Sequence, residues 1–253
     1  PMIGKSYHID NLTYESEPEY GVIEISLDSV VELQKTSDEH YIYMDFLTPH
    51  EVYDKVVVID AGHGGSDPGT SGNGLVEKEY TLKFADYLNR RFNELGANST
   101  LVRSTDETVT PTERVNRILN AYGNSPDVLV ISNHLNAGGA SGAEVIYALR
   151  NNDTLSKLIL ENLSKEGQSI RKAYQRRLPS DNSKDYYFIH RNTGVTEPII
   201  IEYGFLDNKG DAERIKNNWE KYAEAVVKAV AEYKNIPYGE STSSTTYTVQ
   251  RGD

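Results

Sequence analysis

Three polar side chains in this 253-residue chain stand at or just beyond the ends of apolar, β-branched runs. Such runs are typical of strands buried on both faces. The runs and their polar residues are 56–59 with His63, 128–131 with His134, and 199–201 with Glu202. Two imidazoles and one carboxylate form the ligand set of hydrolytic zinc sites, whose fourth position stays open to water. These residue types therefore predict a metal site at one edge of a sheet.

Two glutamates could serve this site in different ways. Glu202 comes after three isoleucines, where a buried carboxylate is costly unless it is paired or functional. Burial would raise its pKa toward the range in which a side chain shuttles protons. Glu77 lies at the start of a predicted helix, where acidic residues are common because they complement the helix dipole. Glu79 is a rival for the ligand position, two residues further on.

The segment around His63 is rich in glycine, and missing Cβ atoms let the backbone and a ligand approach the imidazole closely. Two other interpretations compete with a metal site. A phosphate-binding turn would need a GxGxxG spacing or a Lys-Ser/Thr pair, and the segment has neither. The alternative is a tight turn that happens to hold a histidine. The glycines are Gly62, Gly64, Gly65 and Gly69.

Composition limits the possible partners. The chain has no cysteine, so a metal must be held by His, Asp or Glu. Of the net charge of −12, residues 1–54 carry −10, because twelve acidic residues there face two lysines. This balance argues against nucleic acid as a partner, since phosphate binding requires clustered Lys and Arg. No apolar run approaches the roughly 18 to 20 residues that span a bilayer. We expect a monomer.

From residue 55 onward, the pattern alternates between strands and helices. Such alternation predicts an α/β fold with a mostly parallel or mixed central sheet and helices on both faces. The carboxyl ends of the strands, where open α/β sheets keep their sites, then share one edge. We expect strands at 56–59, 99–103, 127–132, 143–149, 186–189 and 198–205, and helices at 77–95, 112–122, 154–165 and 210–234.

The sequence divides into three parts. Residues 1–53 form a short β-rich extension, with strands expected at 22–27 and 41–47 and an arm or loop over 1–20. We expect residues 54–236 to form the domain that carries the predicted metal site, in which 167–186 is a basic segment expected to be mobile. Its cations at 171–177 could meet carboxylates of a substrate or could simply form a solvated helix face. Residues 237–253 are a Ser/Thr-rich linker whose end resembles the start of a LysM glycan-binding repeat.

Four separated motifs resemble those of the zinc-dependent N-acetylmuramoyl-L-alanine amidases of the Amidase_3 type. The similarity runs in order over about residues 55–235. Its motifs are DAGHGGSDPG at 60–69, GLVEK at 74–78, SNHLNA at 132–137 and EYGFLDN at 202–208. Two residues depart from the family pattern, Asn133 and Leu135, and both flank His134. These departures bear on the shape of the pocket.

The resemblance implies an enzyme that cleaves the amide bond between N-acetylmuramic acid and the L-alanine of the stem peptide in peptidoglycan. It implies His63, Glu77 and His134 as ligands of Zn²⁺ and Glu202 as the catalytic carboxylate. It thereby favours Glu77 over Glu79. The long helical insertion that blocks the site in some members is not expected here. Peptidoglycan is the implied partner, and the implied location is extracellular or in the cell wall.

Two further residues are candidates for contact with the substrate, and each has a simpler alternative. Asn136 follows His134 closely, and it could instead cap the loop after its strand. Arg103 could instead pair with Asp106 or Glu107 at the surface.

Two other functions compete with the amidase assignment. A wall-binding module that has lost catalysis would not need all four site residues. A zinc deacetylase or peptidase would use the same site on a different amide.

Overall fold

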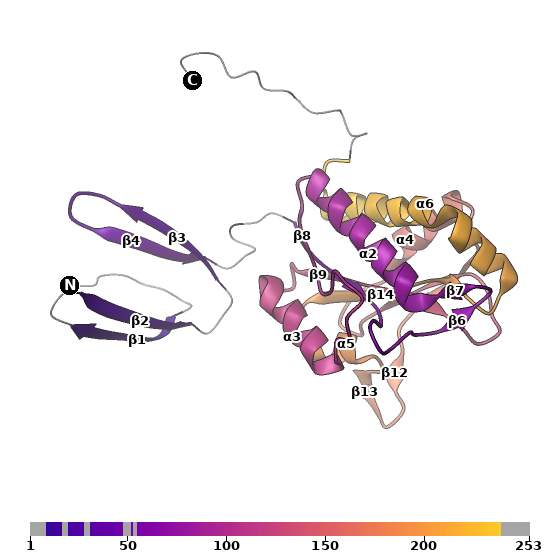
Figure 1. The fold of residues 1–253 in the computed structure, drawn as a ribbon, viewed down its shortest axis with the longest axis horizontal. Helices are drawn as coiled ribbons and strands as arrows, with labels where there is room; N and C mark the ends of the chain where they lie inside the picture. Colours follow the sequence, from indigo (N-terminus) through magenta and orange to yellow (C-terminus); the bar gives the residue numbers. More distant parts are fainter. Residues whose placement is uncertain (1–8, 17–19, 28–30, 48–51, 53–54, 239–253) are drawn as a thin grey trace, which may run out of the picture.

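The computed structural model describes residues 9–16, 20–27, 31–47, 52 and 55–238. Its centre is a six-stranded sheet in the order β11-β10-β14-β9-β5-β8 (Figure 1). The strands are β5 (Val56–Ala61), β8 (Asn98–Leu101), β9 (Leu129–Asn136), β10 (Ala143–Tyr147), β11 (Ile170–Tyr174) and β14 (Glu197–Phe205). Strands β8, β5, β9 and β14 are parallel, whereas β10 runs antiparallel to β14 and parallel to β11. The prediction of a mixed central sheet is confirmed.

Helices cover both faces of this sheet, as the alternation of strands and helices predicted. Helices α2 (Glu77–Glu94), α4 (Thr154–Lys165) and α6 (Lys209–Lys234) pack over one face, above the larger hydrophobic core. Helices α3 (Pro111–Tyr122) and α5 (Phe188–Asn192) pack over the other face, above a smaller core.

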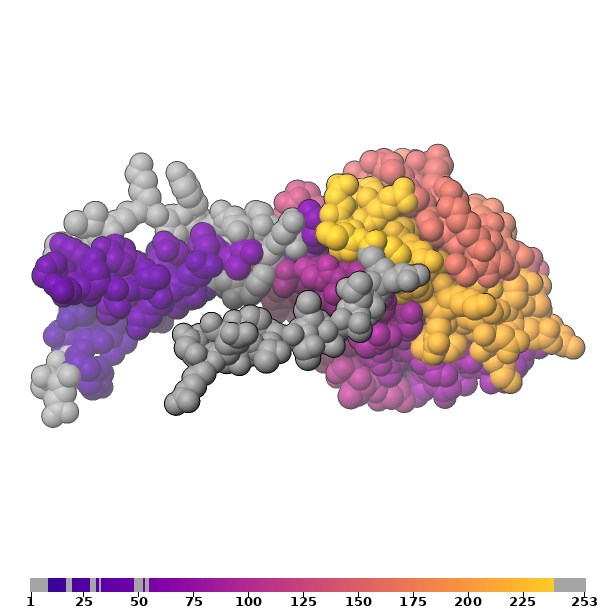
Figure 2. All heavy atoms as spheres, turned by 90° about the horizontal axis from the view of Figure 1, so that it is seen from above, coloured from indigo at the N-terminus to yellow at the C-terminus, as the bar shows by residue number. Residues whose placement is uncertain are grey.

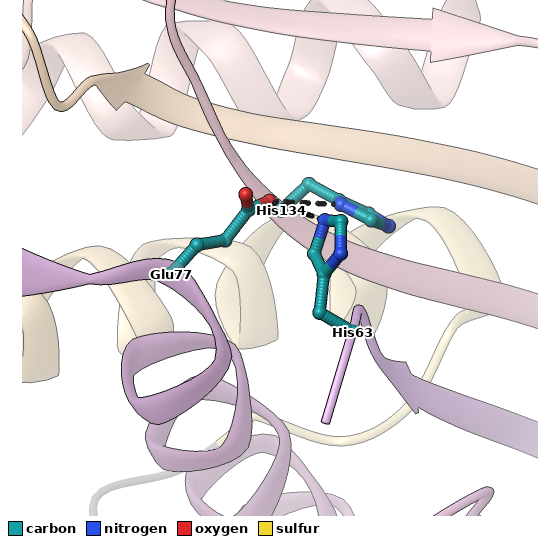
Figure 3. Close-up of side chains that lie close together, drawn as sticks. All are labelled: His63, Glu77 and His134. Atoms are coloured by element: carbon teal, nitrogen blue, oxygen red, sulfur yellow. Dashed lines mark hydrogen bonds and ion pairs between the residues drawn. The ribbon is translucent and has the colours of Figure 1, made fainter. Parts of the chain in front are cut away.

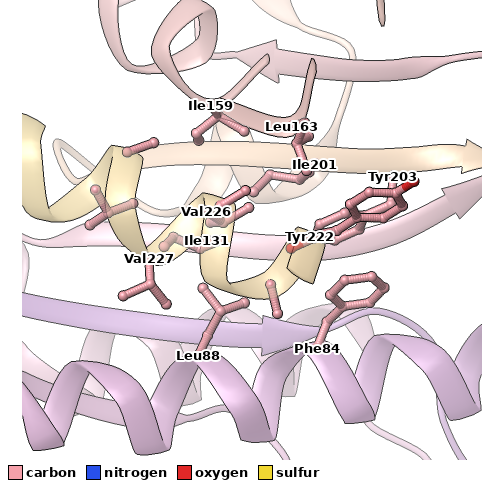
Figure 4. Close-up of a cluster of buried hydrophobic side chains, with 14 of the residues drawn as sticks. Phe84, Leu88, Ile131, Ile159, Leu163, Ile201, Tyr203, Tyr222, Val226 and Val227 are labelled. Carbon is pink, nitrogen blue, oxygen red and sulfur yellow. The ribbon is translucent and has the colours of Figure 1, made fainter. Parts of the chain in front are cut away.

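Strand β5 illustrates how the sequence produces these layers. Its side chains alternate between the two cores, with Val57 and Ile59 in the larger one and Val56 and Val58 in the smaller one. Successive side chains of a strand point to opposite faces, so a strand covered on both faces needs apolar residues at every position. In the larger core, the Phe84 ring of α2 stacks on Tyr203 of β14 with centroids 3.6 Å apart (Figure 4).

The region 167–186 differs from the prediction of a mobile basic segment. It contains β11 and a hairpin of β12 (Arg177–Leu178) and β13 (Asp181–Asp185). The strand predicted at 186–189 is also wrong, because α5 begins within it. A tertiary contact holds this short helix, because Arg150 donates to the His190 carbonyl at 2.6 Å. Local residue patterns do not contain such information.

The amino-terminal part forms two hairpins, as expected for a β-rich extension. They pair β1 (Ile9–Ser16) with β2 (Gly21–Leu27) and β3 (Glu32–Ser37) with β4 (Ile42–Leu47). The expected arm or loop over 1–20 is therefore wrong at 9–16. Figure 2 shows the hairpins to one side of the α/β domain, and their described residues join neither core.

Two predictions fall wholly or partly beyond the described chain. The Ser/Thr-rich linker and the LysM-like start lie at 237–253, of which 239–253 are outside the described residues. Within the described ranges, no helix combines the length and the hydropathy that crossing a bilayer requires.

The stacked pair in the larger core gives a test of this architecture. Phe84→Ala removes a fully buried ring and should lower the free energy of unfolding by about 3–5 kcal/mol. Ile42→Ala, at a residue 63% exposed in a hairpin, should lower it by less than about 0.5 kcal/mol. Urea denaturation measures both. Similar losses in the two variants would contradict this description of the core.

Candidate metal centre

Four predicted site residues meet at one edge of the sheet, although they come from different elements. His134 lies within β9, not beyond its end, and its partner in the register of β14 is Glu202. His63 follows β5, and Glu77 is the first residue of α2. Between His63 and α2, the short strands β6 (Ser71–Gly72) and β7 (Leu75–Val76) pair with each other and lead the chain back to the start of α2.

His63, Glu77 and His134 form a compact cluster (Figure 3). One potential ligand atom from each lies within 4.8 Å of the others. Glu77 Oε1 is 3.2 Å from His63 Nε2 and 3.0 Å from His134 Nδ1, so one carboxylate oxygen lies between two imidazoles. Glu79 is exposed and takes no part in this cluster. The geometry therefore favours Glu77 as the third ligand.

Hydrogen bonds fix the orientation of these side chains. Glu77 is 3% exposed, and it accepts from the backbone N–H of Leu135 at 2.9 Å and of Thr70 at 2.8 Å. His63 Nδ1 contacts the Asp67 carboxylate at 2.8 Å, which leaves Nε2 directed at Glu77. A carboxylate bound to the far nitrogen of a ligating histidine is a common support in metal sites, because it fixes the ring and increases its basicity.

Glycines make this close approach possible. A Cβ atom on Gly62 would lie 2.3 Å from His134 Cε1, and one on Gly69 would lie 2.5 Å from Glu77 Oε2. Gly69 also has a backbone φ of +66°, which residues other than glycine rarely adopt. The glycine-rich segment thus serves the His/Glu/His cluster. The interpretation as an incidental tight turn does not account for these contacts.

Two buried arginines hold the backbone on either side of His63, which has a φ of 60°. Arg114 donates to the carbonyl of His63 at 3.0 Å and to that of Ala61 at 2.8 Å. Arg103 donates to the carbonyls of Ala61 and Gly62, at 3.0 Å each. These bonds stabilise a left-handed conformation that is unfavourable for histidine in isolation.

A contact between Arg103 and substrate stays a prediction, although its side chain is 1% exposed and is engaged with backbone carbonyls. The alternative of a surface pair is wrong, because Asp106 pairs with Lys78 at 2.7 Å and Glu107 pairs with Arg117 at 2.9 Å. The start of α2 and the His63 loop enclose this side chain.

Asn136 is half-buried and makes the local bond that the simpler interpretation expected. Its Oδ1 accepts from the Ala137 N–H at 2.8 Å, and its Nδ2 donates to Glu144 at 3.2 Å. A contact between Asn136 and substrate stays a prediction.

The two residues that depart from the family pattern are both buried. Asn133 accepts from the Tyr203 hydroxyl at 2.8 Å, and Leu135 supplies its N–H to Glu77.

The electrostatics of the cluster suit a cation. Burial lowers the pKa of His63, but the Glu77 and Asp67 carboxylates outweigh this effect and raise the pKa to about 9. Burial raises the pKa of Glu77, but hydrogen bonds with His134 and His63 outweigh it and hold the pKa well below its usual value. The cluster therefore favours positive charge between its members. Nitrogen and carboxylate donors without thiolates fit zinc, and three of them leave one position open.

A cavity of about 190 Å³ adjoins the cluster and contains Glu202 in its lining. Burial raises the pKa of Glu202 to about 7, and its Oε2 is buried without a hydrogen-bond partner among the described residues. Asp60, Arg114 and Tyr187 also line the cavity, and the sequence analysis did not select them. Asp60 could have been found, because it too is a carboxylate at the end of a buried run.

The fold and this site define an α/β domain with the donor set of a hydrolytic metal centre at the edge of its sheet. The family model for N-acetylmuramoyl-L-alanine amidase matches residues 57–232. The chain therefore belongs to the N-acetylmuramoyl-L-alanine amidase family, as its four motifs suggested.

The chain is also similar to individual proteins over most of this domain. Uncharacterized protein YqiI of Bacillus subtilis (strain 168) is 32% identical over 183 residues, which cover 71% of this chain and 84% of that protein. N-acetylmuramoyl-L-alanine amidase CwlM of Bacillus licheniformis is 35% identical over 165 residues, which cover 64% of this chain and 61% of CwlM.

Solved structures share the fold. Cwp6 from Clostridium difficile aligns with a TM-score of 0.65 and 27% identity, over 72% of this chain and 29% of that chain. The catalytic domain of CwlV, an amidase from Bacillus (Paenibacillus) polymyxa var. colistinus, aligns with a TM-score of 0.61 and 22% identity, over 72% of this chain and 99% of CwlV. The chain thus spans under a third of Cwp6 and nearly all of the CwlV domain.

The contact between Asp67 and His63 gives a test of the site. Asp67→Ala should weaken zinc binding about 10- to 100-fold, because the ligand ring loses the carboxylate that orients it. Competition with a chromogenic chelator measures the affinity. Asp153→Ala is the control, since Asp153 precedes α4 on the other face of the sheet. Equal affinities in Asp67→Ala and in the unaltered protein would contradict this role for Asp67.

Proposed function

We propose that this chain hydrolyses the amide bond between the lactyl group of N-acetylmuramic acid and the L-alanine of the stem peptide, with zinc as its metal. The observation that carries the proposal is the convergence of donor atoms from His63, Glu77 and His134 in a chain of the amidase family. These residues would hold the ion. When bound there, zinc would polarise the amide carbonyl and lower the pKa of water toward neutrality.

Glu202 is proposed as the general base and then the general acid. Its carboxylate lines the same cavity as both histidines and has a pKa of about 7, which suits a group that gains and loses a proton at neutral pH. The carboxylate takes a proton from the attacking water while the water oxygen bonds to the carbonyl carbon. It then gives that proton to the alanine nitrogen as the carbon–nitrogen bond breaks. The products are a free lactyl carboxylate and a free amino terminus.

The substrate, the location and the division into domains are also proposals. Peptidoglycan is the proposed substrate, and the cell wall or the extracellular space is where the enzyme would meet it. We propose residues 54–236 as the catalytic domain and 1–53 and 237–253 as flanking segments. The monomeric state and the absence of nucleic acid as a partner stay predictions.

The Glu202→Gln variant tests the proposed chemistry. Glutamine has a similar shape but cannot take up the proton, so the cleavage rate should fall about 10²- to 10⁴-fold while zinc binding persists. Amino-terminal labelling of digested peptidoglycan measures cleavage, and elemental analysis measures zinc per chain. Glu79→Gln, which changes an exposed carboxylate on α2, is the matched control and should behave as the unaltered protein.

Four outcomes would contradict the proposal. Near-normal digestion by Glu202→Gln would remove Glu202 from this role. New amino termini other than L-alanine would favour a peptidase, and released acetate would favour a deacetylase. Wall binding without any cleavage by the unaltered protein would favour a binding module.

A further inference from the structure

A row of charged side chains crosses the sheet from the metal ligands to its far edge. His134 on β9 is in register with Glu202 on β14, Glu202 with Glu144 on β10, and Glu144 with Lys172 on β11. Residues in register on neighbouring strands project from the same face of a sheet. Adjacent strands lie about 4.8 Å apart, so the row extends about 14 Å beyond His134.

A β-bulge adds a second cation to the end of this row. Ala143 pairs with Ile170, but the next residue, Glu144, pairs with Lys172, so Arg171 is the extra residue between them. Regular alternation would direct Arg171 and Lys172 to opposite faces. The bulge changes this direction, and both cations reach the same carboxylate: Arg171 Nη1 bonds to Glu144 Oε1, and Lys172 Nζ lies 3.9 Å from it.

Glu144 serves as the fixed anchor of this group. It is 2% exposed, and Asn136 Nδ2 and the Tyr174 hydroxyl also donate to it, at 3.2 and 3.4 Å. The side chains of Arg171 and Lys172 are 41% and 45% exposed. One buried negative charge thus orients two positive charges that reach solvent. The group carries a net positive charge in a protein of net charge −12.

We propose that Arg171 and Lys172 form a subsite that binds a carboxylate of the stem peptide, on the L-alanine side of the amide that is cleaved. This inference rests on the function proposed above. Arg and Lys are the side chains that recognise carboxylates through charge-assisted hydrogen bonds. The lactyl carboxyl group of muramic acid is part of the amide and carries no charge. The acidic groups nearest that bond therefore belong to the peptide.

The position of the subsite agrees with this direction. Glu202, which delivers a proton to the alanine nitrogen, lies between the metal ligands and Arg171 in the row. The two strand spacings from Glu202 to β11 amount to about 10 Å, or about three residues of extended peptide. A carboxylate within the first three stem residues therefore fits the distance.

The test compares two forms of one substrate. Purified peptidoglycan is used as prepared and after its free carboxylates have been converted to carboxamides, and kcat/KM is measured from new L-alanine amino termini. The unaltered enzyme should prefer the free-carboxylate form about tenfold, equivalent to about 1.4 kcal/mol. This preference is the ratio of kcat/KM on the free-carboxylate form to kcat/KM on the carboxamide form. In Arg171→Ala and in Lys172→Ala the ratio should fall toward one, mainly through a higher KM for the free-carboxylate form.

Lys157→Ala is the matched control. It removes one positive charge from an α4 side chain that is 68% exposed, on the other face of the sheet, and should keep the ratio of the unaltered enzyme. Lys172→Ala leaves the closer Arg171–Glu144 bond in place, so it tests the subsite even if Arg171→Ala unfolds. Thermal denaturation monitors folding in each variant.

Each remaining result would overturn the subsite. Equal rates on both forms by the unaltered enzyme would do so, as would an unchanged ratio in folded Arg171→Ala and Lys172→Ala, or an equal fall in Lys157→Ala. In all of these cases the amidase function would stand. Failure of the unaltered enzyme to release L-alanine termini from either form would instead contradict the proposed function itself, and the subsite with it.

Discussion

The buried carboxylate of Glu77 is the interaction on which the site depends. It lies at the start of α2, accepts two backbone hydrogen bonds and contacts both imidazoles. A carboxylate removed from water is stable only when its charge is compensated. The buried charge of Glu77 therefore requires three features together. They are the position of α2 against the sheet, the glycine-rich turn next to Glu77, and the bonds to the two histidines. A shift of α2 would leave this charge without partners.

The remaining scaffold supports that constraint from the other side. His63 has a left-handed backbone conformation, and Arg103 and Arg114 hold the carbonyls of residues 61–63. The register between β9 and β14 sets His134 beside Glu202. The proposed metal ligands and the proposed proton shuttle are thus fixed by regular elements and buried hydrogen bonds. Such rigid support is what precise placement of catalytic groups requires.

The sequence predicted the features that follow from local periodicity and charge. Buried β-branched runs identified the strands that carry His134 and Glu202, and the mixed sheet followed from the alternation of elements. Glu77 and Glu79 could not be separated by spacing alone, because both lie in the first turn of a helix and only the packing of α2 buries one of them. The burial of Arg103 could not be predicted, because it depends on segments distant in sequence. The bulge at Arg171 was equally hidden, because it arises from strand pairing.

We propose one zinc ion held by three side chains from separate parts of the chain. Calorimetric titration of the metal-free protein with zinc tests this most directly, alongside His63→Ala and His134→Ala. We expect one zinc per chain in the unaltered protein and loss of that binding in both variants, with the fold retained. No zinc bound by the unaltered protein, or unchanged binding in either variant, would contradict it.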